Sequence, residues 1–160
     1  MSYDLDDVDR QLLELLQEDG RYAATELAER IGVSDNTIHN RMDRLREAGV
    51  ISGYTVTIEY DRAGLELYFM FSCTTPISNR SMVAQEALSI PEVVEVTELM
   101  TGDRNLQIKV LGSQDEDITR IAEKLDQLSL EINDENLVRA ERTDALKLTA
   151  IEESVADKGE

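Results

Sequence analysis

Residues 25–45 read TELAERIGVSDNTIHNRMDRL and have the pattern of two short helices joined by a tight turn. Leu27 and Ile31 recur at the helical period and give the first helix an apolar face. Gly32 follows where a helix commonly ends in the left-handed region, and Ser34 stands where an N-cap hydroxyl is expected. This order predicts a helix-turn-helix, a motif whose second helix lies in the major groove of DNA.

The second helix of this pair has one apolar side and one polar side. Ile38, Met42 and Leu45 share the apolar side and are predicted to pack on the first helix. The polar side carries amide, hydroxyl and imidazole groups near the helix start, which is the half that meets base edges. The predicted DNA-binding residues are Ser34, Asn36, Thr37, His39, Asn40, Arg41 and Arg44.

These side chains are expected to have different roles. Asn36, His39 and Asn40 are predicted to face base edges, since asparagine can pair bidentately with adenine. Thr37, Arg41 and Arg44 are expected to hold the DNA backbone or the frame of the domain. Arg41 lies near the edge of the apolar side and has Asp9 as an alternative partner. Short helix pairs with a glycine turn also occur in domains that bind no DNA, so an interaction scaffold is an alternative.

The composition is that of a folded chain without a membrane or metal signature. The 160 residues are 41% apolar, which predicts one or two small domains, and no apolar run approaches a membrane span. The acidic N-terminus lacks a signal-peptide pattern, which predicts a cytoplasmic protein. The single cysteine, Cys73, lies in an apolar run and is interpreted as a buried thiol. With one histidine and no Cys/His cluster, neither a metal nor a cofactor is expected.

The net charge of −18 is unusual for a DNA-binding protein, which typically has a basic footprint. Residues 1–50 contain twelve Asp and Glu against six Arg and no Lys, so the predicted DNA-binding half is itself negative. Acidic residues in every segment with few lysines favour a protein from a salt-saturated cytoplasm, such as that of a halophilic archaeon. There, salt screens the self-repulsion of the chain. An ordinary acidic protein is the alternative.

Sequence on both sides of residues 25–45 completes the first domain. Residues 5–17 form an amphipathic pattern with aspartates at its start, where the helix dipole favours anions. Residues 50–58 are strand-like and follow Gly49, so the predicted domain is a winged helix-turn-helix over residues 1–52. A linker is predicted over residues 53–64.

The second half of the chain has a different periodicity. Strands are predicted at 65–73, 93–100, 106–111 and within 137–148, and helices at 81–89 and 115–128. The order β-α-β-β-α-β predicts a ferredoxin-like domain over residues 65–148, followed by an acidic tail over 149–160 that is expected to fray. The fold class is therefore α+β. Because the strand at 67–71 is apolar and aromatic, the sheet is predicted to pack against a second copy in a symmetric dimer.

Two sets of residues carry a resemblance to a known family. Asp9-Arg10 together with Gly49-Val50-Ile51-Ser52-Gly53-Tyr54 resembles the Lrp/AsnC, or feast/famine, family of transcription factors. The second half is similar to the family's ligand-sensing domain, known as RAM, the regulator of amino-acid metabolism. The resemblance implies sequence-specific binding to a pseudo-palindromic operator on double-stranded DNA. It also implies a homodimer that can assemble into tetramers or octamers.

Residues 101–105, Thr101-Gly102-Asp103-Arg104-Asn105, read as a hairpin turn on backbone grounds alone. In the family, a Gly-Asp-X-Asp loop at the interface between sensing domains helps to hold a small effector, typically an amino acid. The resemblance therefore implies an amino-acid-like effector on these five residues at the dimer interface. Asn105 replaces the second acid of the pattern, and Arg104, at a position often aromatic, favours an acidic ligand. An empty turn is the alternative.

The sequence favours a non-enzyme. None of the hydroxyl and thiol candidates Ser34, Cys73 and Ser81 has a base partner recognisable in the sequence. Some proteins that resemble this family are sirohaem decarboxylase subunits, which use His and Arg over a tetrapyrrole. This enzyme is the alternative from another functional class, but residues 65–148 contain no histidine.

Overall fold

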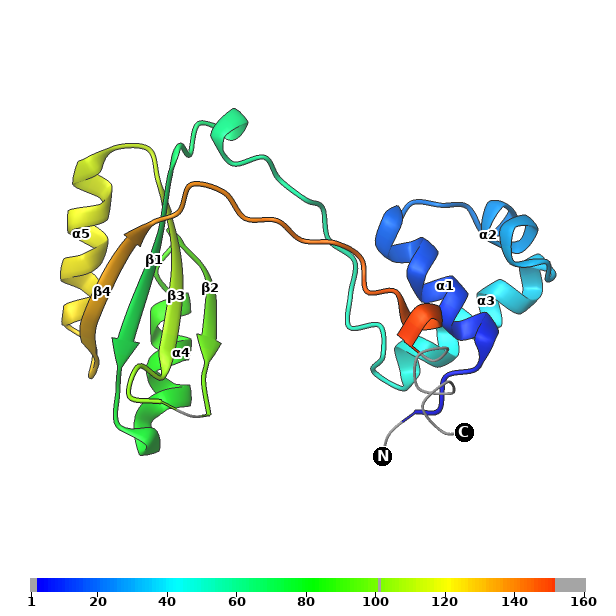
Figure 1. Cartoon of the computed structure of the whole chain (residues 1–160), viewed down its shortest axis with the longest axis horizontal. Coiled ribbons are helices and arrows are strands. Elements are labelled where there is room, and N and C mark those ends of the chain that lie inside the picture. The colour runs from blue at the N-terminus through cyan, green and yellow to red at the C-terminus, as the bar shows by residue number, and fades with distance from the viewer. Residues whose placement is uncertain (1–2, 101, 152–160) are drawn as a thin grey trace. The chain divides into compact units, whose positions relative to one another are not determined.

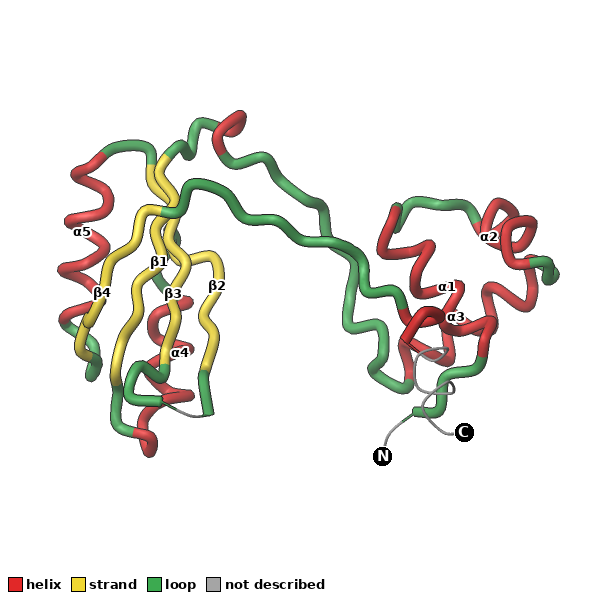
Figure 2. The backbone as a smooth tube through the Cα atoms, in the orientation of Figure 1, coloured by secondary structure: helices red, strands yellow, loops and turns green. Residues whose placement is uncertain are grey.

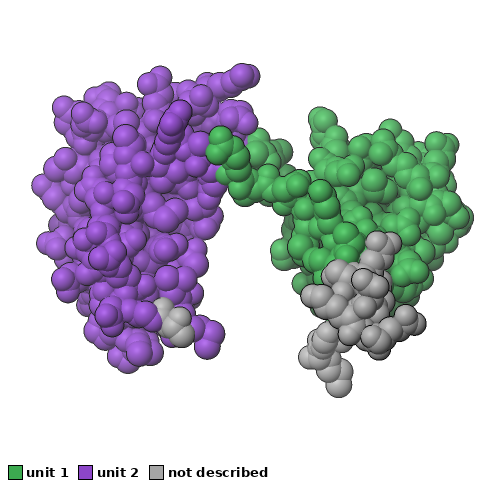
Figure 3. Space-filling view, in the orientation of Figure 1, with its two compact units in different colours: residues 1–57, 142–160 green, residues 58–141 purple. Residues whose placement is uncertain are grey.

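The computed structural model describes residues 3–100 and 102–151, which form two compact units (Figure 3). Unit 1 comprises residues 1–57 and 142–160, and unit 2 comprises residues 58–141. Unit 1 is therefore built from both ends of the chain, with unit 2 inserted between them. This division differs from the predicted one, which grouped residues 142–148 with the sheet.

Unit 1 is a three-helix domain. Its helices are α1 (Asp7–Glu18), α2 (Ala24–Ile31) and α3 (Asp35–Glu47) (Figure 1). Helix α1 begins with a capping box, in which the backbone N–H of Asp9 donates to the Asp6 carboxylate at 3.0 Å and the Asp6 N–H donates to the Asp9 carboxylate at 3.3 Å. Gly32 ends α2 in the left-handed region with φ of 84°. The buried core residues are Leu12, Leu27, Ala28, Ile38 and Leu45. The predicted helix-turn-helix is confirmed.

The strand predicted after α3 is not formed within this chain. Residues 53–59 have no secondary structure, and the side chains of Val56 and Ile58 are 75% and 50% exposed. The alternation of apolar residues suits a strand, but a strand is stable only when another strand pairs with its backbone. Among the described residues no strand pairs with this segment, so the three helices lack the predicted wing.

Unit 2 contains the predicted ferredoxin-like arrangement (Figure 2). Its elements are η1 (Asp61–Ala63), β1 (Leu67–Thr74), η2 (Ile77–Asn79), α4 (Arg80–Leu88), β2 (Val93–Glu98), β3 (Leu106–Gly112), α5 (Asp115–Asp126) and β4 (Glu131–Leu137). The strands form one sheet in the order β2-β3-β1-β4, and every neighbouring pair is antiparallel. The order of elements β-α-β-β-α-β is therefore confirmed.

Both helices of unit 2 cover the same face of the sheet. Phe71 and Cys73 of β1 and Ile108 of β3 point to this face and are fully buried with residues from α4 and α5. Alternation along the strands directs the neighbouring residues to the other, open face. The last strand covers residues 131–137, so the strand predicted within 137–148 is wrong. Strand β4 has the polar sequence EINDENL and lies at the edge of the sheet, so it lacks the apolar alternation by which a strand is predicted.

Candidate nucleic-acid interface and effector loop

Helix α3 separates buried from exposed residues as its sequence predicts. Ile38 and Leu45 are fully buried, whereas Asn36, His39 and Asn40 are exposed. Within the part of the chain that the structure describes, no hydrogen bond or ion pair engages these three polar side chains. Their amide and imidazole groups are therefore available to a partner outside the chain.

The start of α3 is fixed by two hydroxyl groups. The Ser34 hydroxyl accepts the backbone N–H of Thr37 at 3.2 Å, and the two side-chain oxygens lie 2.9 Å apart. Ser34 is thus the N-cap of α3, which orients the first turn of the helix. Both predicted residues lie beside the exposed polar face.

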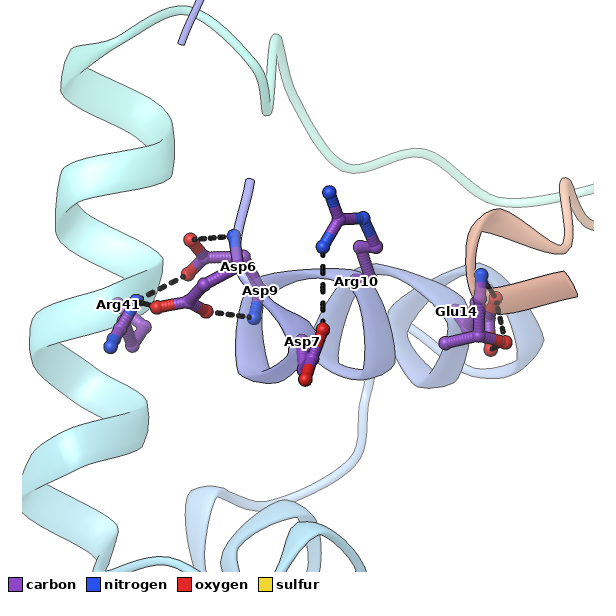
Figure 4. A network of polar contacts seen from close by, with 7 residues as sticks. Asp6, Asp7, Asp9, Arg10, Glu14 and Arg41 are labelled. Carbon is purple, nitrogen blue, oxygen red and sulfur yellow. Dashed lines mark hydrogen bonds and ion pairs between the residues drawn. The ribbon is translucent and has the colours of Figure 1, made fainter. Parts of the chain in front are cut away.

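Arg41 connects α3 to α1 (Figure 4). Its guanidinium pairs with the carboxylates of Asp6 and Asp9, and Nη1 lies 3.2 Å from Asp9 Oδ1. The Asp9 side chain is only 1% exposed, so Arg41 compensates a carboxylate that lies away from water. The pKa of Asp6 is lowered, first by the backbone N–H of Asp9 and further by Arg41. Arg41 therefore makes the internal pairing with Asp9 that the sequence offered as an alternative partner.

The other arginines of α3 are more exposed. The guanidinium of Arg44 lies 5.8 Å from the centre of the Tyr3 ring, within the range of a cation–π contact. Arg46 is exposed in the last turn of α3 and was not among the predicted residues.

The loop between β2 and β3 is occupied by internal contacts. Thr101 lies outside the described residues, and Gly102 has φ of 96°, as a tight turn requires. The backbone carbonyl of Asp103 accepts the Thr74 hydroxyl at 2.8 Å. The guanidinium of Arg104 forms an ion pair with Asp134 of β4. The Arg104 charge is therefore already paired in this structure.

Asn105 has a structural role that its sequence pattern did not indicate. Its side chain is buried, accepts the backbone N–H of Thr75 at 3.0 Å and donates to the Thr75 carbonyl at 2.8 Å. Both ends of the amide are used to join the loop to the end of β1. The prediction that this side chain contacts an effector does not fit its position, since it points into the domain.

Residues 3–100 and 102–151 contain no candidate membrane-spanning helix and no candidate metal-binding group. No helix there is long and apolar enough to cross a membrane, and no group of three or more His, Cys, Asp or Glu is arranged to hold a metal ion. Cys73 is fully buried, and burial raises the pKa of its thiol to about 12. Its burial confirms the prediction of a buried thiol. Because of the raised pKa, the thiol is neutral at physiological pH.

Comparison with known proteins gives consistent matches. Residues 5–46 match the model of the AsnC-type helix-turn-helix domain. The chain is 33% identical over 114 residues to the HTH-type transcriptional regulator FL11 of Pyrococcus furiosus, which covers 71% of this chain and 75% of that protein. Its structure is similar to the crystal structure of MtbAldR, with a TM-score of 0.72, 28% identity and coverage of 89% and 99% of the two chains. A transcriptional regulator of Neisseria meningitidis, solved as a complex with L-Met, has a TM-score of 0.78, 23% identity and coverage of 91% and 96%.

Proposed function

Because the chain belongs to the Lrp/AsnC family of transcriptional regulators, we propose that it recognises a specific operator through the exposed face of α3. The observation that carries this proposal is the free hydrogen-bonding capacity of Asn36, His39 and Asn40. These side chains lie in the N-terminal half of a helix whose cap and core contacts fix its orientation. Such a helix can read base edges in the major groove.

The relatives decide between this function and the enzyme alternative. Two relatives that are 33% and 31% identical to this chain over 114 and 118 aligned residues are named as transcriptional regulators. A tetrapyrrole decarboxylase would use histidine in the sensing half, and residues 65–148 contain none. The chain is therefore a regulator and not an enzyme of that kind.

The proposed regulator acts as a dimer. Helices α4 and α5 cover only one face of the sheet in unit 2, and the open face includes Tyr68 and Met70. Packing this face against a second copy would bury it and would provide two copies of α3. Two recognition helices about one DNA turn apart, roughly 34 Å, would suit a pseudo-palindromic operator. Sedimentation that shows only monomers, in dilute buffer and in molar KCl, would contradict the dimer.

The proposed effector is a small amino acid bound near residues 102–104. One supporting observation is the fold shared with the regulator of Neisseria meningitidis that was solved with L-Met. Another is the exposed position of Gly102, Asp103 and Arg104, which offers both charges that an amino acid requires. An acidic ligand would have to share or replace the contact of Arg104 with Asp134. Calorimetric titration with L-Met and with L-Asp would identify which class binds.

The decisive experiment is binding to the DNA upstream of the chain's own gene. We expect fluorescence anisotropy to show tighter binding to this DNA than to a random duplex of equal length, and amino acids to change the affinity. Affinity should be measured in dilute buffer and in molar KCl, because salt screens the repulsion between this acidic chain and DNA. Equal affinity for both duplexes at every salt concentration would favour the interaction scaffold over a sequence-specific regulator.

A further inference from the structure

The C-terminal segment, residues 146–151, binds along α1 within unit 1. The Leu146 N–H donates to Gln17 Oε1 at 3.1 Å, and Gln17 Nε2 donates to the Leu146 carbonyl at 3.4 Å. One turn earlier in α1, Glu14 Oε1 accepts the backbone N–H of Thr149 at 2.7 Å and its hydroxyl at 2.9 Å. These reciprocal contacts fix both the position and the direction of the segment.

Apolar side chains of the segment and of α1 line a common pocket. A pocket of 380 Å³ lies beside the segment in unit 1. Its apolar lining includes Leu13, Leu16, Ile51, Tyr54, Leu146 and Leu148. The hydrogen bonds of Leu146 and Thr149 attach the segment to α1, although the sequence predicted a fraying tail from residue 149. Residues 152–160 of that predicted tail lie outside the described residues.

The opposite end of α1 holds the recognition helix (Figure 4). Asp6 caps the helix and Asp9 lies in its first turn, and both pair with Arg41 of α3. From Asp9 to Gln17 the helix rises about 12 Å at 1.5 Å per residue. One rigid helix therefore contacts the C-terminal segment at one end and the recognition helix at the other.

We propose that Glu14 and Gln17 are positioning residues for operator recognition, which rests on the DNA-binding function proposed above. They attach the chain that follows β4 to α1, and α1 transmits that attachment to α3 through Arg41. The sensing unit is thereby connected to the recognition helix by two routes. One is the chain that enters unit 2 after α3, and the other is the C-terminal segment.

Detachment of the segment lowers affinity for the operator. Without these contacts α1 gains conformational freedom, and the helix must be ordered again when α3 fits its site. Specific binding depends on the exact placement of α3, whereas nonspecific binding depends on charge. The loss is therefore expected on the operator and not on random DNA.

The test compares variants at the contact with matched variants on the same helix. The double variant Glu14→Ala/Gln17→Ala removes both attachments, and Gln11→Ala/Glu18→Ala changes the same residue types at exposed positions of α1. We expect the first to bind the operator about tenfold more weakly, within the usual range of coupling between sites, and the second to bind unchanged. Hydrogen exchange in α1 should become faster in the first variant only. Glu14→Gln should retain most of the affinity because it keeps Oε1 as an acceptor.

A variant on the segment itself keeps the proposal testable if the double variant does not fold. Thr149→Val removes the hydroxyl that donates to Glu14, and Thr149→Ser keeps it. We expect Thr149→Val to bind the operator more weakly than the unmodified chain and Thr149→Ser to bind it equally well. Unchanged operator affinity, tighter binding, or an equal loss on operator and random DNA would each overturn the proposal. Failure of the unmodified chain to prefer its operator would instead refute the proposed function.

Discussion

The start of α3 and the loop after β2 have a similar local sequence pattern, but their polar side chains differ in whether they are bonded within the fold. Each follows a glycine with positive φ, Gly32 or Gly102, and each offers polar side chains. On α3, Asn40 is exposed and is bonded to none of the described residues. In the loop, Asn105 is buried and both ends of its amide bind the backbone of Thr75.

This difference separates polar residues that can recognise a ligand from polar residues that stabilise the fold. A polar group whose hydrogen bonds are made inside the fold stabilises that fold, and its removal leaves buried partners unpaired. An exposed polar group without internal partners contributes little to stability and keeps its bonding capacity for a ligand. The same residue type, asparagine, is therefore unbonded and exposed on α3 but buried and fully bonded in the loop, and a recognition role is proposed only for the former.

Arg41 is the strongest test of this distinction, since it lies on α3 but has the internal contacts of a supporting residue. Arg41→Ala would leave the buried Asp9 carboxylate without its cation. We expect a loss of about 3 kcal/mol in the free energy of unfolding of unit 1. Urea unfolding followed by circular dichroism measures it, and Arg46→Ala at an exposed position is the control. A change as small as that of the control would place Arg41 with the recognition residues.

Asn105→Ala is the corresponding test in unit 2. The substitution leaves the N–H and carbonyl of Thr75 without their partners, at a cost of about 2–3 kcal/mol in unfolding free energy. Asn136→Ala, at an exposed position of β4, should change stability by less than about 0.5 kcal/mol. Similar values for the two variants in thermal unfolding would show that burial of the amide is unimportant.

Asn40→Ala tests the recognition side of the comparison. We expect the operator affinity to fall by about 1–3 kcal/mol, with little change on random DNA and none in stability. Fluorescence anisotropy on both duplexes, with circular dichroism on the same samples, gives the result. An equal loss on both duplexes would assign Asn40 to contacts with the DNA backbone.

Acid should weaken the contact between α1 and α3. The pKa of Asp6 is lowered in the folded state, so its contribution is complete above the ordinary pKa and is lost as the pH falls through the lower folded value. This window lies below about pH 4. Because Asp6 is half exposed, we expect the contribution to be less than about 1 kcal/mol. Asp6→Asn should flatten this part of the stability curve, and an unchanged curve would exclude the contribution.

Raising the salt concentration is the change for which we expect the smallest loss of operator affinity. Most regulators lose affinity steeply as salt rises, because fewer counterions are released from the phosphates. Here residues 1–50 are net negative, and Arg41 is already paired with two aspartates. We expect affinity that is flat or rises toward molar KCl, where the Debye length is about 3 Å. A steep loss while the chain stays folded would contradict this expectation.

The sequence predicted those features that depend on local pattern. Helical periodicity and Gly32 placed the helix-turn-helix, and alternation placed three of the four strands. Strand β4 was misplaced because an edge strand can be polar on both faces. The contacts of α1 with the C-terminal segment join residues 129 and 135 positions apart, and no local pattern reports such a pairing. The role of Asn105 was missed for the same reason, since Thr75 lies 30 positions away.

The construction of unit 1 from both chain ends has a consequence for the order of synthesis. Residues 58–141 form a continuous unit and leave the ribosome before residues 146–151 do. The three helices emerge first, but the contacts of Glu14 and Gln17 can form only after almost the whole chain has been made. A nascent or prematurely terminated chain therefore carries an incomplete DNA-binding unit. Completion of unit 2 therefore precedes completion of unit 1.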